Sequence, residues 1–137
     1  MAHWLYKSEP SAWSWEQQVA AAESGTSWNG VRNHLAKQHL QAMRLGDQGF
    51  FYHSNEGKAV VGIVEVIRTY HPDPTDESGR FGMVDVRAVT ALPRPVTLEA
   101  IKAEPRLKDM ILVNNSRLSV QPVTEDEWTI VRAMGGL

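Results

Sequence analysis

The segment Lys7-Ser8-Glu9-Pro10 combines a cation, a hydroxyl and a carboxylate where a predicted strand ends. Pro10 restricts the preceding Glu9 to an extended backbone, which fixes the direction of its carboxylate. A carboxylate at the floor of a pocket can accept a hydrogen bond from the exocyclic amine of cytosine. In the alternative interpretation Glu9 is a surface residue paired with a neighbouring basic side chain, because most charged side chains stay solvated.

A second candidate site is the segment 28–33, which contains Trp28, Val31, Arg32 and Asn33 around a flexible Gly30. Asn33 is a typical helix N-cap, and the free N–H groups at a helix start can bind phosphate or a base carbonyl. Trp28 could stack on an extruded base, and Arg32 could hold phosphate oxygens. The alternative makes Trp28 a core residue and Arg32 a partner in a structural ion pair.

A third polar group, His53-Ser54-Asn55, ends an aromatic strand at a place where a pocket could open. Strand alternation puts Phe51 and His53 on one face. His53 is a candidate general base, although a lone histidine at a strand end is more often structural.

No spacing in the sequence identifies an enzyme. There is no cysteine, which excludes a disulfide, a thiolate metal site and a catalytic cysteine. His34 and His39 are five positions apart, so they do not share a helical face as metal-binding i,i+4 pairs do. Neither a Gly-x-Ser-x-Gly turn nor a carboxylate pair suited to acid–base chemistry is present. We therefore expect no catalytic residue, no metal and no cofactor.

The composition predicts one domain over residues 1–137. The net charge is −2, from 14 basic and 16 acidic residues. A protein that binds duplex DNA mainly through its phosphates is typically strongly basic. A nucleic-acid ligand would therefore need a local site. Neither a signal peptide nor an apolar run of about 18–20 residues is found, so we expect a cytoplasmic protein without a membrane partner.

The remaining sequence predicts the elements that must position these segments. The first helix should bury Trp15, Val19 and Ala22 and stop at Gly25. Four or five mostly antiparallel strands with flanking helices predict an α+β fold built on a small closed β-barrel, since closure removes exposed sheet edges. The expected strands cover 3–8, 48–53, 58–70, 83–92 and 117–120, and the expected helix caps are Ser14, Asn33, Thr97 and Thr124.

Segments in order along nearly the whole chain resemble the EVE domain family; they are 4–10, 28–33, 51–55, 61–66 and 117–123. The resemblance implies a PUA-like barrel, in one broad group with PUA, ASCH and YTH domains. It also implies a domain that binds modified bases, with modified cytosine in DNA the favoured ligand.

By the same resemblance, Lys7, Ser8 and Glu9 occupy the place of the Lys-Ser-Asn with which YTH domains read a base edge. An acid there would prefer an amine donor over an adenine ring nitrogen, which is consistent with cytosine.

The segment 30–33 is similar to a YTH segment in which a valine precedes a cage tryptophan. Here that position is Arg32, so Trp28 is expected to supply the aromatic wall, with Phe81 as a second candidate.

The expected function is therefore a nucleic-acid-binding module that recognises a flipped, modified, cytosine-type base. The alternatives are an RNA-binding accessory domain that ignores modification and, less favoured, a nucleotide-processing enzyme that uses Glu9 or His53. The expected partner is DNA with modified bases, or RNA, and the chain is expected to be a monomer.

Overall fold

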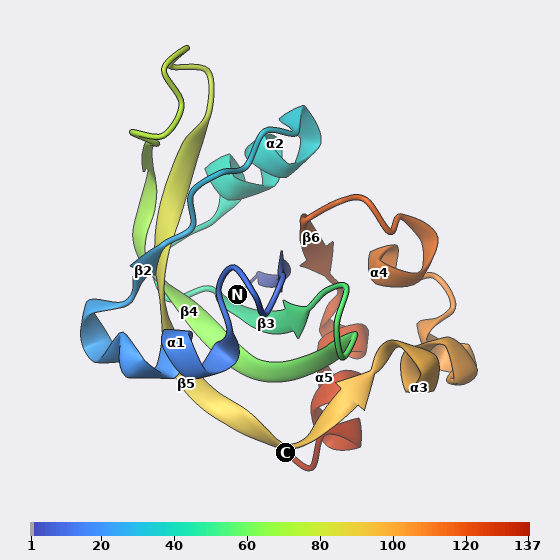
Figure 1. Ribbon diagram of the computed structural model, residues 1–137. Helices are drawn as coiled ribbons and strands as arrows, with labels where there is room; N and C mark the ends of the chain where they lie inside the picture. The colour runs from blue at the N-terminus through green and yellow to red at the C-terminus, as the bar shows by residue number, and fades with distance from the viewer. Residues whose placement is uncertain (1) are drawn as a thin grey trace.

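The computed structural model describes residues 2–137, which form a curved sheet surrounded by short helices (Figure 1). None of these helices is long and apolar enough to cross a bilayer. The strands are β1 (His3–Ser8), β2 (Thr26–Ser27), β3 (Gln48–His53), β4 (Ala59–Pro72), β5 (Gly82–Thr97) and β6 (Val120–Val123). The α-helices are α1 (Trp15–Ala20), α2 (His34–Ala42), α3 (Leu98–Ala103), α4 (Ile111–Asn114) and α5 (Glu125–Met134), and two 3₁₀ turns cover Ala22–Ser24 and Pro105–Leu107.

The six strands pair in the order β2-β5-β4-β3-β1-β6. Only β1 and β3 run parallel, and the other four pairings are antiparallel, so the predicted α+β class with a mostly antiparallel sheet is confirmed. Register irregularities bend the long strands β4 and β5. Within residues 2–137 the edge strands β2 and β6 do not pair with each other, so the predicted closure into a barrel is not confirmed.

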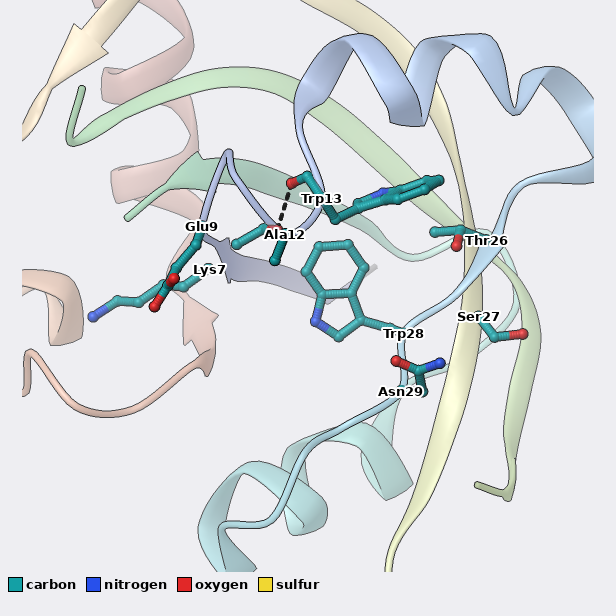
Figure 2. Close-up of a pocket in the computed structure, with 9 residues that line it drawn as sticks. Lys7, Glu9, Ala12, Trp13, Thr26, Ser27, Trp28 and Asn29 are labelled. Atoms are coloured by element: carbon teal, nitrogen blue, oxygen red, sulfur yellow. Dashed lines mark hydrogen bonds between the residues drawn. The ribbon is translucent and has the colours of Figure 1, made fainter. Parts of the chain in front are cut away.

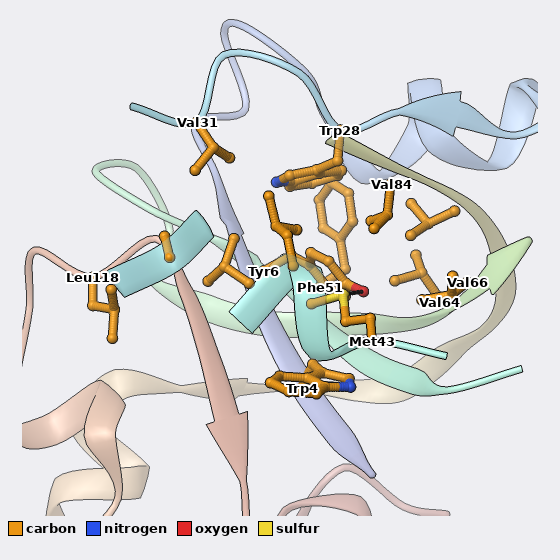
Figure 3. Packing of buried hydrophobic residues seen from close by; sticks show 14 of the residues in the cluster. Trp4, Tyr6, Trp28, Val31, Met43, Phe51, Val64, Val66, Val84 and Leu118 are labelled. Atoms are coloured by element: carbon orange, nitrogen blue, oxygen red, sulfur yellow. Dashed lines mark hydrogen bonds between the residues drawn. The ribbon is translucent and has the colours of Figure 1, made fainter. Parts of the chain in front are cut away.

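Both faces of the central strand β3 are buried. Phe51 belongs to a hydrophobic cluster with Tyr6 and the α2 residue Leu40 (Figure 3). Phe50 belongs to a second cluster, which includes Trp128 of α5. The alternation along β3 therefore separates two hydrophobic clusters, one on each face of the strand.

The predicted helix starts are confirmed at all four caps, Ser14, Asn33, Thr97 and Thr124. The predicted buried face of the first helix is confirmed at Trp15, which is buried, and is wrong at the other positions. The α-helix ends at Ala20, Val19 is 50% exposed, and Gln18 is buried instead. The closing strand lies at Val120–Val123, three residues later than predicted.

Candidate functional site

A pocket of about 450 Å³ opens between the end of β1, the turn that follows it, and β2 (Figure 2). Its volume falls in the range of small-ligand sites, about 300–1,000 Å³. Two segments distant in the sequence form it, because β1 lies inside the sheet while β2 pairs with β5 at an edge. The lining residues are Lys7, Ser8, Glu9, Ala12, Trp13, Thr26, Ser27, Trp28 and Asn29.

The turn after β1 is tied back to the strand by short hydrogen bonds. The N–H groups of Ala12 and Trp13 both donate to the carbonyl oxygen of Glu9 at 2.9 Å. The hydroxyl of Ser8 donates to the carbonyl oxygen of Trp13 at 2.6 Å. Together these bonds fix the backbone of residues 8–13 around the pocket mouth.

The charged groups of the pocket differ in how they are held. The Nζ of Lys7 donates to the carbonyl oxygen of Ser116 at 2.7 Å, and burial lowers the pKa of Lys7. Glu9 is exposed, and within residues 2–137 its carboxylate makes no ion pair or hydrogen bond. Its oxygens are therefore available to accept hydrogen bonds from a ligand.

Two indoles lie at the other side of the pocket from Lys7 and Glu9 (Figure 2). Trp28 is 8% exposed and packs edge-on against Tyr6 and Phe51, with ring centroids 5.2 and 5.6 Å away. It is thus both a core residue and part of the pocket wall. Trp13 is half-buried, and its Nε1–H donates to Gln18 Oε1 at 2.9 Å.

Of the residues singled out in the sequence, Lys7, Ser8, Glu9 and Trp28 line this pocket. Sequence reasoning did not single out Trp13. Its signal was an aromatic residue four positions after Glu9, in the turn between a strand and a capped helix.

Asn29 lines the pocket as well, whereas residues 30–33 lie outside its lining. Val31 is buried in the first hydrophobic cluster. Arg32 forms an ion pair with Asp73, as one of the two sequence interpretations proposed. The side chain of Asn33 caps α2 by accepting a hydrogen bond from the N–H of Ala36 at 2.9 Å.

The polar group at the end of β3 also lies outside the lining. The Nε2 of His53 accepts a hydrogen bond from the backbone N–H of Trp15 at 3.0 Å. Burial lowers the pKa of His53, and the negative charge of Glu16 offsets part of this effect. Ser54 and Asn55 belong to the turn between β3 and β4, where Ser54 N–H donates to the carbonyl oxygen of Ser8 at 2.9 Å. The backbone of Ser54 thus holds the end of β1, and the ring of His53 holds the start of α1.

Phe81, the second expected wall, packs instead near the start of α2. Its ring centroid lies 5.1 Å from that of His34, and Arg32 and Lys37 place cationic groups within 6 Å of its centre. It does not line the pocket.

Comparison with known protein families matches residues 2–134 to the EVE domain. The sequence is 35% identical to thymocyte nuclear protein 1 of Gallus gallus over an alignment 164 positions long, which covers 96% of this chain and 68% of that protein. A crystal structure of an Agrobacterium tumefaciens protein superposes with a TM-score of 0.98 at 56% identity, covering all of this chain and 94% of that one.

Two further structures were solved with nucleic acid. Human THYN1 protein in complex with 5-methylcytosine-containing DNA has a TM-score of 0.93 at 31% identity, covering all of this chain and 99% of that one. The YTH domain of Zygosaccharomyces rouxii MRB1 protein, in complex with N6-methyladenosine RNA, has a TM-score of 0.59 at 20% identity, covering 99% and 85% of the two chains. The second likeness concerns the fold alone.

Proposed function

This chain belongs to the EVE domain family, and on that premise we propose that it is a nucleic-acid-binding module whose pocket holds one flipped, modified cytosine. The single observation that carries the proposal is that one pocket brings the unpaired carboxylate of Glu9 together with the indoles of Trp13 and Trp28. The complex of human THYN1 with 5-methylcytosine-containing DNA supports the same ligand class.

The indoles supply the apolar part of the binding energy. Contact of a base with an aromatic side chain stabilises binding by about 1–3 kcal/mol, whereas extruding a base from a duplex costs a few kcal/mol. One such contact therefore does not offset flipping, and the pocket needs the second indole and its polar groups as well. Single-stranded DNA, in which the extrusion cost is smaller, should bind more tightly than duplex.

Glu9 supplies the selection for cytosine over thymine and uracil. A carboxylate only accepts hydrogen bonds, and the exocyclic amine of cytosine is a donor, as is that of adenine. Thymine and uracil present a carbonyl at the equivalent position, which would face the carboxylate without a proton between them. The charge of Glu9 makes this hydrogen bond roughly twice as strong as one to a neutral acceptor.

A 5-methyl group adds a smaller preference. Burying one methyl-sized group contributes about 0.8 kcal/mol, which corresponds to roughly fourfold in affinity. We therefore expect a modest ratio between 5-methylcytosine and cytosine from this pocket, and a larger ratio between cytosine and thymine.

The experiment is a fluorescence-anisotropy titration of matched single strands that differ only at one central position, with 5-methylcytosine, cytosine or thymine there. A matched RNA strand tests the alternative of an RNA-binding domain that ignores modification. The proposal expects the order 5-methylcytosine, cytosine, thymine; equal and weak binding of all three strands, or preferred binding of RNA without regard to modification, contradicts it.

A pair of glutamate substitutions sharpens this test. Glu9→Gln should reduce the preference for cytosine over thymine, because the amide presents both a donor and an acceptor. Glu56→Gln is the matched control, since Glu56 is also exposed but does not line the pocket.

A further inference from the structure

Gln18 of α1 is a completely buried polar side chain. Its exposed fraction is 0%, and its Oε1 accepts the hydrogen bond from Trp13 Nε1 at 2.9 Å. Its Nε2 donates to the carbonyl oxygen of Val86 in β5 at 3.3 Å. A buried amide is tolerated only where its donor and acceptor are satisfied, and here the pocket residue Trp13 is one of its two partners.

The other end of Gln18 reaches the second wall of the pocket. Val86 is the β5 residue paired with Thr26 of β2, and Thr26 lines the pocket. Space beside the Val86 carbonyl depends on Gly25, where an added Cβ would lie 2.2 Å from that oxygen. Gln18 therefore spans from the turn after β1 to the β2–β5 edge.

The backbone of Trp13 is fixed independently of Gln18. Its carbonyl accepts from Ser8, and its N–H donates to Glu9. These bonds leave the side-chain torsions of a half-buried indole free to choose among rotamers. Among residues 2–137, the bond to Gln18 is the one side-chain hydrogen bond that holds the indole plane.

We infer that Gln18 is a positioning residue, which sets the orientation of the Trp13 indole in the pocket wall through the hydrogen bond to Nε1 and so controls affinity for the base without touching it. The inference rests on the proposed function. A pre-set indole spares the ligand the entropy of ordering that side chain on binding. Gln18 does not line the pocket, so its effect on affinity must pass through Trp13.

The test uses Gln18→Met, in which an unbranched side chain of similar size lacks the amide. We expect its affinity for the 5-methylcytosine strand to fall roughly fivefold, the scale of one intramolecular hydrogen bond. The control is Val131→Ala, a buried change in α5 within the second cluster. It should lower Tm as well but leave the affinity unchanged.

A double-substitution cycle separates positioning from general loss of structure. Trp13→Phe keeps an aromatic ring but removes the Nε1–H donor. If Gln18 acts through that donor, Gln18→Met should have almost no effect on affinity in the Trp13→Phe protein. A change of less than about twofold lies within the usual scatter of such cycles. The same fivefold loss in both backgrounds would overturn the inference.

Hydrogen exchange of the Trp13 indole N–H tests the same bond in a protein whose core is not substituted. Among the five tryptophans, the Trp13 resonance is the one lost in Trp13→Phe, and it should exchange slowly with solvent in the unsubstituted protein. Exchange at the rate of a free indole would overturn the inference, as would equal affinity of the Gln18→Met and unsubstituted proteins. Both results leave the proposed function standing, whereas failure of the unsubstituted protein to prefer the modified strand removes the proposed function and this inference with it.

Discussion

The carboxylate of Asp73 lies 3.2 Å from the guanidinium of Arg32, and the Asp73 side chain is completely buried while that of Arg32 is 39% exposed. Asp73 also accepts hydrogen bonds from the N–H of Gly30 at 2.8 Å and from the N–H and hydroxyl of Thr75. Burial alone would raise the pKa of Asp73, but these hydrogen bonds outweigh it and hold the pKa below its ordinary value. The carboxylate of Asp73 thus links residues 30–32, which follow β2, to the loop between β4 and β5.

Asp73→Asn should therefore destabilise the fold. The substitution keeps the shape but exchanges a charged acceptor of several hydrogen bonds for a neutral amide, and we expect a loss of about 2 kcal/mol in the free energy of unfolding. Urea denaturation followed by circular dichroism measures it. Asp109→Asn, at an exposed position, is the control and should change little; an equal effect of the two substitutions would contradict the role assigned to Asp73.

The two pocket tryptophans should separate stability from binding. Trp28 is buried against Tyr6 and Phe51, so Trp28→Ala should reduce the free energy of unfolding by about 3–5 kcal/mol. Trp13 is half-buried in a turn, so Trp13→Ala should cost clearly less stability while it still weakens base binding by about 1–3 kcal/mol. Thermal unfolding and an oligonucleotide titration on both proteins check this, and a larger stability loss for Trp13→Ala would show that its packing has been misjudged.

Helix starts could be predicted because capping is decided within a few residues. Ser14 with Gln17, and Thr124 with Glu127, form capping boxes in the structure. The bounds of β1 and β3 could also be predicted, but those of β4, β5 and β6 could not, since pairing across the sheet sets them. β5 continues through Pro93, beyond its predicted end at Leu92.

The pocket shows the same division between local and long-range information. Lys7, Ser8 and Glu9 are consecutive, and their shared place at the end of a strand was readable in the sequence. Their meeting with Trp28 was expected from the family resemblance, and it depends on a six-strand order that no local pattern encodes. Asn33, also a candidate site residue, does not line the pocket, because its side chain caps α2 as the sequence predicted.

The place of Trp13 in the pocket was not predicted, because the side chain that holds its indole, Gln18, is polar. The expected apolar face of the first helix included Val19, whereas the structure buries Gln18, whose amide is satisfied by Trp13 and by β5. Hydrophobic periodicity does not reveal a buried position of this kind, because the side chain that fills it is an amide.

Acid should weaken the fold partly through His53. Its Nε2 accepts the N–H of Trp15, which requires the neutral ring, and burial lowers its pKa below the ordinary 6.5. A group with a lowered histidine pKa binds fewer protons when folded, so its contribution is complete above pH 6.5 and declines as the pH falls below that value.

His53→Gln keeps a hydrogen-bond acceptor that does not titrate near neutrality, so its free energy of unfolding should fall less between pH 7 and about pH 5 than that of the unsubstituted protein. His3 and His39, whose pKa values burial also lowers, remain in both proteins and cancel in the comparison. Identical pH slopes for the two proteins would count against this role of His53.

The base-binding role of the pocket is tested by locating the modified base on the molecule. In a ¹⁵N-NMR titration with a short single strand that carries one 5-methylcytosine, the indole N–H resonances of Trp13 and Trp28 and the backbone amides of residues 7–9 should shift saturably. The indole of Trp128, in the second cluster, should stay in place as an internal reference. Saturable shifts confined to another surface, or no shift at the two pocket indoles, would contradict the claim that this pocket is the base-binding site.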